Sequence, residues 1–186
     1  MRDLTKIRDA YGKWRESAGF SLIELLIVVA IILIIAAIAI PNLVRSRMAA
    51  NEASAVENLR TITTASVVYN TTWGNGYPPA LATLGGPPSP TATCDQAQLV
   101  NELITSPPNQ QSGYTFAYTG QGAPGAAPPG CSQPGFSGYL ATATPMTEGT
   151  SGQRAFCSDT PGVIHFDPAG TPPTTVSECD ALQTLQ

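Results

Sequence analysis

One carboxylate stands out because of the residues around it. Glu24 lies within an apolar segment (residues 20–44), and no charged or strongly polar side chain occurs between Leu25 and Ile40. A carboxylate at membrane depth is costly unless a cation pairs with it. No basic residue follows within one helical turn. The chemistry expected of Glu24 is therefore charge pairing, with a partner that lies elsewhere.

The chain has few residues that could support catalysis or metal binding. His165 is its one histidine, and a catalytic role would need an orienting acid such as Asp159 or Asp167 and a serine nucleophile. A lone histidine in a strand-like sequence is far more often a packed or edge residue. Asp159 and Asp167 bracket a turn, but two carboxylates are too few for a calcium site of about six to eight oxygens. We expect no enzymatic activity, no metal and no cofactor.

The cysteines predict disulfides. The widely spaced set contains no Cys-x-x-Cys pair, which argues against zinc. Two disulfides in an exported domain fit better, and three connectivities are possible. We favour Cys94–Cys131 and Cys157–Cys179, since each closes a short loop.

The element that holds Glu24 is a predicted membrane-spanning helix. The roughly 25 residues of the apolar segment would span about 37 Å, whereas a bilayer core is about 30 Å thick. Five of the nine basic residues precede Gly19, which favours a cytoplasmic N-terminus. Arg45 and Arg47 oppose this orientation weakly. The remainder of the chain would then lie outside the cytoplasm, where thiols oxidise.

The helix is predicted to continue as an amphipathic helix. Its two parts are a transmembrane or assembly half, residues 20–47, and an amphipathic half, residues 48–73. Pro41 should kink or locally open it, and Gly74 and the prolines after Tyr77 should end it. An apolar stripe recurs every three or four positions in the second half: Ala49, Ala53, Val56, Leu59, Ile62, Ala65 and Tyr69.

Residues 74–186 read as a loop-rich globular head. We expect a short helix at 95–104 and an exposed Gly- and Pro-rich loop at 120–135. A turn is expected at 160–162. Tyr69, Trp73 and Tyr77 should pack between helix and sheet. Strands are predicted at residues 113–119, 136–144, 154–158 and 163–166. The fold class is α+β, a long N-terminal helix packed against an antiparallel sheet of about three to five strands.

The charge distribution limits the classes of partner that the chain can bind. Charged residues make up only 12% of the chain, and the formal net charge is −4. A nucleic-acid binder usually shows a basic stripe, and here the basic residues gather in the first 19 positions. We therefore predict no nucleic-acid partner.

The N-terminal sequence resembles a known signal. Gly19-Phe20-Ser21-Leu22-Ile23-Glu24, followed by an apolar run, is similar to the class III signal of type IV pilins and type II secretion pseudopilins. Pro41 falls at the twenty-second position after the cleavage point, where that family places a proline. The run from Tyr77 to Leu84, Tyr-Pro-Pro-Ala-Leu-Ala-Thr-Leu, is similar to the turn after the long helix in many members. The specific resemblance covers about residues 15–84.

The resemblance implies how the chain is processed and assembled. A prepilin peptidase and N-methyltransferase removes the leader, residues 1–19, by cutting between Gly19 and Phe20, and methylates the new Phe20 amine. Membrane lipid surrounds the apolar helix until an inner-membrane assembly platform adds the subunit to a homo-oligomeric filament. The Phe20 amine would neutralise Glu24 of the same or a neighbouring subunit, and this pair would set the register, as buried polar residues do in coiled coils. Leu33 stands where many members have glycine, so we expect a regular helix up to Pro41.

These observations lead to three hypotheses about the function of the chain. We expect the structural subunit of a type IV pilus or pilus-like filament, single-pass in a bacterial inner membrane with its head in the periplasm, and later in an extracellular or periplasmic filament. One alternative is a pseudopilin of a type II secretion system. Another is a membrane-anchored periplasmic binding module that never polymerises. Cleavage at Ala37-Ile38-Ala39, as in ordinary secretory signals, would release a soluble protein, but Glu24 inside such a signal argues against it.

Overall fold

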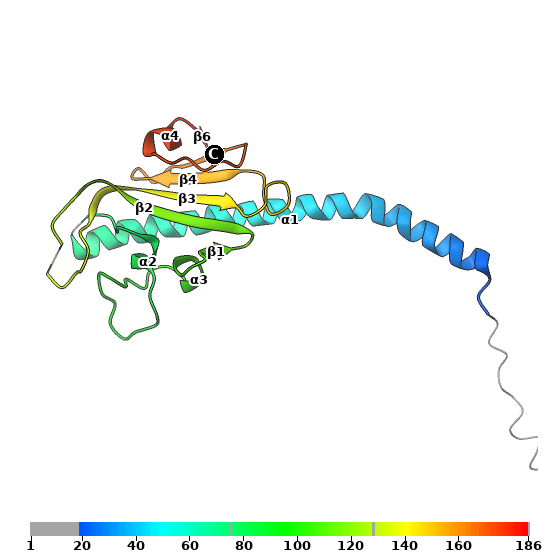
Figure 1. Cartoon of the computed structure of the whole chain (residues 1–186), viewed down its shortest axis with the longest axis horizontal. Coiled ribbons are helices and arrows are strands. Elements are labelled where there is room, and N and C mark those ends of the chain that lie inside the picture. Colours follow the sequence, from blue (N-terminus) through cyan, green and yellow to red (C-terminus); the bar gives the residue numbers. More distant parts are fainter. Residues whose placement is uncertain (1–18, 75, 128, 186) are drawn as a thin grey trace, which may run out of the picture. The chain divides into compact units, whose positions relative to one another are not determined.

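The structure, a computed structural model, describes residues 19–74, 76–127 and 129–185. The leader expected at residues 1–19 lies outside this part except for Gly19. The chain forms two compact units, Met1–Asn42 and Leu43–Gln186. The first contains the long helix up to Asn42, and the second contains the rest of that helix and the globular head (Figure 1).

The long helix predicted at residues 20–73 is confirmed as α1, Leu22–Trp73. Pro41 lies inside α1 without ending it, although a proline cannot donate the hydrogen bond that the carbonyl of Ala37 would otherwise accept. Helical structure is regular through Leu33 up to Pro41, as expected. The helix ends before Gly74, which has a positive φ of 64° and donates to the Asn70 carbonyl at 2.9 Å. Glycine adopts this backbone conformation most easily, which explains the stop.

The head contains one antiparallel sheet with its strands in sequence order, β1 to β6. The longest strands, β2 (Tyr114–Pro124) and β3 (Phe136–Pro145), form a hairpin in which Phe116 lies opposite Ala143. The next strands are β4 (Ala155–Asp159) and β5 (Ile164–Asp167). The turn predicted at residues 160–162 connects them, and in it the Gly162 N–H donates to the Asp159 carbonyl. The edge strands, β1 (Gln110–Gln111) and β6 (Gln183–Thr184), are short, and they raise the strand number to six, above the three to five predicted.

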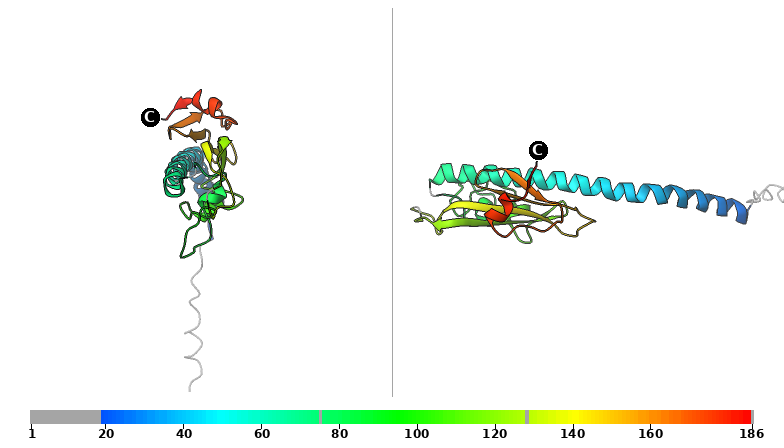
Figure 2. Two further views of the ribbon diagram at one scale, coloured as in Figure 1. Left: turned by 90° about the vertical axis from the view of Figure 1, so that its left-hand side faces the viewer. Right: turned by 90° about the horizontal axis from the view of Figure 1, so that it is seen from above.

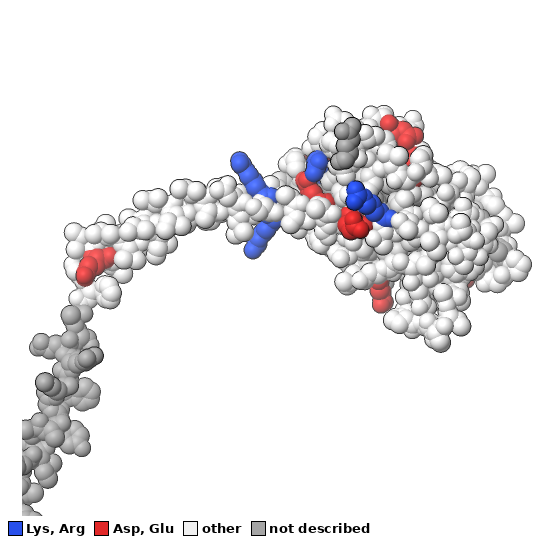
Figure 3. Space-filling model, turned by 180° about the vertical axis from the view of Figure 1, so that it is seen from behind, with Lys and Arg blue, Asp and Glu red and all other residues white. Residues whose placement is uncertain are grey.

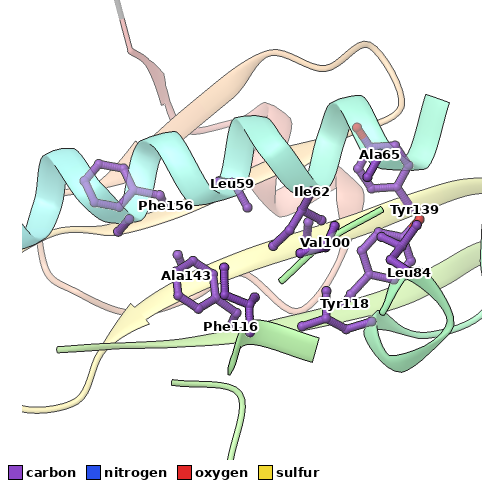
Figure 4. Packing of buried hydrophobic residues seen from close by; sticks show 14 of the residues in the cluster. Leu59, Ile62, Ala65, Leu84, Val100, Phe116, Tyr118, Tyr139, Ala143 and Phe156 are labelled. Carbon is purple, nitrogen blue, oxygen red and sulfur yellow. The ribbon is translucent and has the colours of Figure 1, made fainter. Parts of the chain in front are cut away.

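The core lies between one face of the sheet and the part of α1 that follows Asn42 (Figures 1 and 2). Figure 4 shows Leu59 and Ile62 of α1 above Phe116, Tyr118 and Ala143 of the hairpin. The helix residues buried in the head are Glu52, Ala55, Val56, Leu59, Ile62, Ala65, Ser66 and Tyr69. The α+β fold expected from the sequence is confirmed.

Two details of the predicted stripe are wrong. Ala49 and Ala53 are exposed, whereas Glu52 and Ala55 are buried in their place. In its first turn, the buried face of α1 is therefore offset by one residue from the predicted apolar stripe. Alanines have little apolar surface, so their positions fix the phase of a stripe less strongly than Leu59 or Ile62 do.

The predicted helix at residues 95–104 is wrong for most of its length. Helix α3 covers only Glu102–Thr105, and α2 covers Leu81–Leu84 in the segment that resembled a turn. The amides of Ala97, Leu99 and Val100 donate to carbonyls of Thr83 and Leu84, so they are not available for helical bonds. A further helix that we did not predict, α4 (Val176–Asp180), begins with a capping box between Thr175 and Glu178.

The disulfides have the favoured connectivity, Cys94–Cys131 and Cys157–Cys179. The first joins the segment before α3 to the connection between β2 and β3, where Asp95 also accepts from the Ser132 hydroxyl at 2.7 Å. That connection is shorter than the loop predicted at 120–135, because β2 continues to Pro124. The second disulfide joins α4 to β4, and both of its cysteines are fully buried.

Candidate functional site

Glu24 lies in the first turn of α1, where its side chain caps the helix. Its Oε2 accepts the backbone N–H of Ser21 at 2.9 Å. Ser21 immediately precedes the helix, so Glu24 supplies one half of a capping box. The partial positive charge of a helix N-terminus also favours a carboxylate here. This bond leaves Oε1 free of any hydrogen bond within the described part of the chain.

Gly19 and Phe20 precede the helix and are accessible. Both lie in non-helical backbone, and the Phe20 side chain is 83% exposed. Apart from the neighbours of Gly19 in the chain, no described residue has an atom within 4 Å of the position that a Cβ on Gly19 would occupy. The peptide bond between the two residues therefore lies in a non-helical, uncrowded segment next to the capped helix.

The apolar segment has no cover within the described chain. Its large side chains are exposed, from 83% at Phe20 to 37% at Val44. Within the described residues, α1 is the one helix long and apolar enough to cross a membrane by length and composition. Figure 3 shows this part of α1 as an uncharged surface with an acidic group near its start. An apolar surface of this extent requires lipid or other protein to cover it.

A second glutamate on α1 has a role that sequence analysis missed. Glu52 lies on the face of α1 that packs on the head, where it is buried and forms an ion pair with Arg154 at 2.7 Å. Its Oε1 also accepts the amides of Gln153 and Arg154. Burial raises the pKa of Glu52, but these hydrogen bonds and the Arg154 charge outweigh it and the pKa lies below its ordinary value. The partners are about 100 residues apart in sequence, so local patterns carry no signal for the pair.

The residues considered for catalysis or calcium have structural roles. His165 is buried, with Nδ1 at 3.1 Å from the Leu182 carbonyl oxygen. Asp167 accepts the amides of Ala169 and Thr171 in a turn. It pairs across the sheet with Ala155, at the end of β4 opposite to Asp159. Residues 19–185, apart from 75 and 128, contain no cluster of three or more His, Cys, Asp or Glu side chains suited to a metal.

Asp159 has an unusual environment. Its side chain is 2% exposed, and no hydrogen-bond donor in the described residues reaches Oδ1. Burial raises its pKa, and the nearby Asp180 carboxyl, through its charge and a shared hydrogen bond, raises the pKa further. His165 acts in the opposite direction. Asp159 and Asp180 lie at the ends of β4 and α4, which the disulfide Cys157–Cys179 holds together.

The aromatic residues near the end of α1 pack as expected. The Tyr69 ring centroid lies 4.8 Å from that of Trp73, and Tyr77 lies 5.1 Å from Tyr139 of β3. Tyr69 also donates its hydroxyl to the Cys94 carbonyl. These contacts join the end of α1, the segment after it and the sheet.

Comparison with known proteins supports the resemblance of the N-terminal segment. Residues 14–40 match a family model described as the prokaryotic N-terminal methylation motif. Over 38 residues the chain is 60% identical to the type IV wide pilus major component PilA4 of Thermus thermophilus. That match covers 20% of this chain and 29% of the relative. No solved structure matches. The predicted resemblance to type IV pilins is thus confirmed over the N-terminal segment, and the relative is by its name a structural component of a pilus.

Proposed function

We propose that this chain is the structural subunit of a type IV pilus or a related pilus-like filament. One observation carries the proposal. Glu24 is the only charged residue in the exposed apolar segment of α1, and it lies in fixed register with the N-terminal methylation motif. The fold is consistent with this role, since a long helix with a free apolar half precedes a compact head.

Processing would supply the positive charge that balances the Glu24 carboxylate. A cut between Gly19 and Phe20 would create a cationic amine four residues before Glu24, within about one helical turn. Ser21 occupies Oε2 of Glu24, so Oε1 remains available to that amine. N-methylation at Phe20 keeps the positive charge, and the amine pairs with Glu24 of the same or an adjacent subunit.

Assembly then covers the apolar segment. Burial of a leucine, isoleucine or valine side chain contributes about 1.5–3 kcal/mol, and most residues of this segment are of these types. In the inner membrane lipid provides the cover, and in the filament the helices of neighbouring subunits provide it. Packing against protein and against lipid differ little in hydrophobic energy, so the Glu24 pair determines the register of assembly. The head, beyond the outer face of the membrane, would form the filament surface.

Variants of Glu24 test the proposal in cells that assemble the filament. Glu24→Gln retains an oxygen that can accept the Ser21 N–H but removes the charge, whereas Glu24→Ala removes both. We expect both variants to remain in the membrane and to yield less than a tenth of the wild-type sheared filaments. Glu57→Gln is the matched control, because Glu57 is an exposed acid on α1 with only a surface partner, Arg60, at 3.7 Å. Normal filaments from Glu24→Gln would refute the charge-pairing role.

A further inference from the structure

Two arginines directly after the apolar segment have no acidic partner in the described chain. Arg45 and Arg47 are exposed, and no described acidic residue forms an ion pair with either of them. The other two arginines after Gly19 differ, because Arg60 pairs with Glu57 and Arg154 pairs with Glu52. Arg45 and Arg47 are thus the two basic residues of the described chain whose charge is not balanced by an acidic side chain.

The spacing of these arginines matches the thickness of a bilayer. Twenty residues, 25–44, separate Glu24 from Arg45, and none of them is charged. At 1.5 Å per residue this stretch is about 30 Å long, the thickness of a hydrocarbon core. When one end of the stretch lies at the cytoplasmic boundary of the core, Arg45 lies at the outer boundary, at the depth of the lipid phosphates.

The chemistry of the two side chains suits phosphate. Positions 45 and 47 differ by about 200° around a helix, so the side chains extend to opposite sides, and Figure 3 shows basic side chains on both sides of α1. A guanidinium binds phosphate oxygens through two parallel hydrogen bonds, which a lysine cannot do. No lysine occurs after Lys13. Long basic side chains at the end of a membrane helix place their charge in the headgroup layer.

We propose that Arg45 and Arg47 bind phospholipid phosphates of the outer leaflet and hold the unassembled subunit at a fixed depth in the membrane. This inference rests on the membrane insertion in the proposed function, but it does not require polymerisation. Lipid binding would keep Glu24 near the cytoplasmic headgroups, where water can solvate it before assembly. Extraction into a filament would then require the release of two phosphate contacts per subunit.

Solid-state NMR on bilayers tests this contact directly. The processed chain, isolated from membranes and labelled with ¹³C at arginine Cζ, would be placed in vesicles of phosphatidylcholine and phosphatidylglycerol. Its four arginines are Arg45, Arg47, Arg60 and Arg154. We expect lipid ³¹P to dephase roughly half of the Cζ signal, because two of the four arginines contact phosphate. The double variant Arg45→Gln/Arg47→Gln should lose this dephasing, and Arg60→Gln should retain it.

The alternative partner is an acidic surface on a second copy. In that case the wild-type protein in bilayers would show no ³¹P dephasing, and the double variant would still insert but form no filaments. Dephasing that is equal in the wild type and the double variant would also overturn the proposal. If dephasing occurs as expected while Glu24→Gln assembles normally, lipid binding stands and the charge-pairing account of assembly fails.

Discussion

Two glutamates on α1 illustrate how the environment of a residue decides its role. Glu52 has two backbone amides and a guanidinium around its carboxylate, all from the same chain. Glu24 has one backbone amide from Ser21 and is otherwise exposed beside apolar side chains. The first carboxylate is satisfied within the subunit and stabilises the head. The second is incomplete within the subunit, which is why we assign it to assembly.

Loss of the Glu52 carboxylate should destabilise the head. Glu52→Ala leaves Arg154 unpaired and two amides without their acceptor, and hydrogen bonds to charged groups contribute about 1.5–3 kcal/mol. We expect a loss of about 2 kcal/mol in the free energy of unfolding, measured by denaturant titration of the full chain in detergent. Glu57→Ala should change it by less than about 0.5 kcal/mol, since Glu57 and Arg60 are exposed. Equal effects of the two variants would show that the Glu52 pair is not specifically stabilising.

Asp159 should make stability depend on pH. Burial and then Asp180 hold its pKa above the ordinary value in the folded state. The folded state therefore binds more protons than the unfolded state between the two pKa values, and stability falls as pH rises through the folded pKa. Asp180→Asn removes the neighbouring charge, so the variant should melt at a higher temperature than the wild type at pH 7 and differ less from it at pH 4. A melting temperature that is lowered at both pH values would contradict this.

At the scale of elements, periodic patterns predicted well and long-range contacts did not. The long helix follows from apolar spacing that continues over many positions, whereas β2 to β5 follow from short runs of strand-forming residues bounded by turn residues. The prediction of a helix at residues 95–104 failed because amides of this segment donate to the carbonyls of Thr83 and Leu84. This is a tertiary contact that leaves no local pattern in the sequence. Helix α4 was missed because its five residues are too few for a periodic signal, although Thr175 and Glu178 have the spacing of a capping box.

The disulfide between α4 and β4 should hold the C-terminal elements on the sheet. It closes a loop of 22 residues, for which chain entropy predicts about 3 kcal/mol of stabilisation. The variant Cys157→Ser/Cys179→Ser should show faster amide hydrogen exchange in α4 and β6 than the wild type. The matched variant Cys94→Ser/Cys131→Ser should increase exchange near α2 and α3 instead, and equal exchange in α4 for the two variants would refute the assignment.

For the whole molecule, the apolar residues of α1 divide into two groups with different partners. Those from Ala55 onward, apart from the exposed Val67 and Val68, pack against the sheet and complete the core of the head. Those in the apolar segment have no cover among residues 19–74, 76–127 and 129–185. The sequence alone predicted this division, because a hydrophobic run on all faces precedes a single apolar stripe. In the proposed function, the contacts that cover the apolar segment come from lipid or from other copies, which no pattern within one chain specifies.

The mass of the N-terminal peptide shows whether processing supplies a cation next to Glu24. Protein would be recovered from cells as sheared filaments, digested and analysed by mass spectrometry. We expect an N-terminal peptide that begins at Phe20 and carries one added methyl group, because that amine is the cation that Glu24 requires. A protein that retains Met1 and is found only as dispersed monomers in the membrane would contradict it.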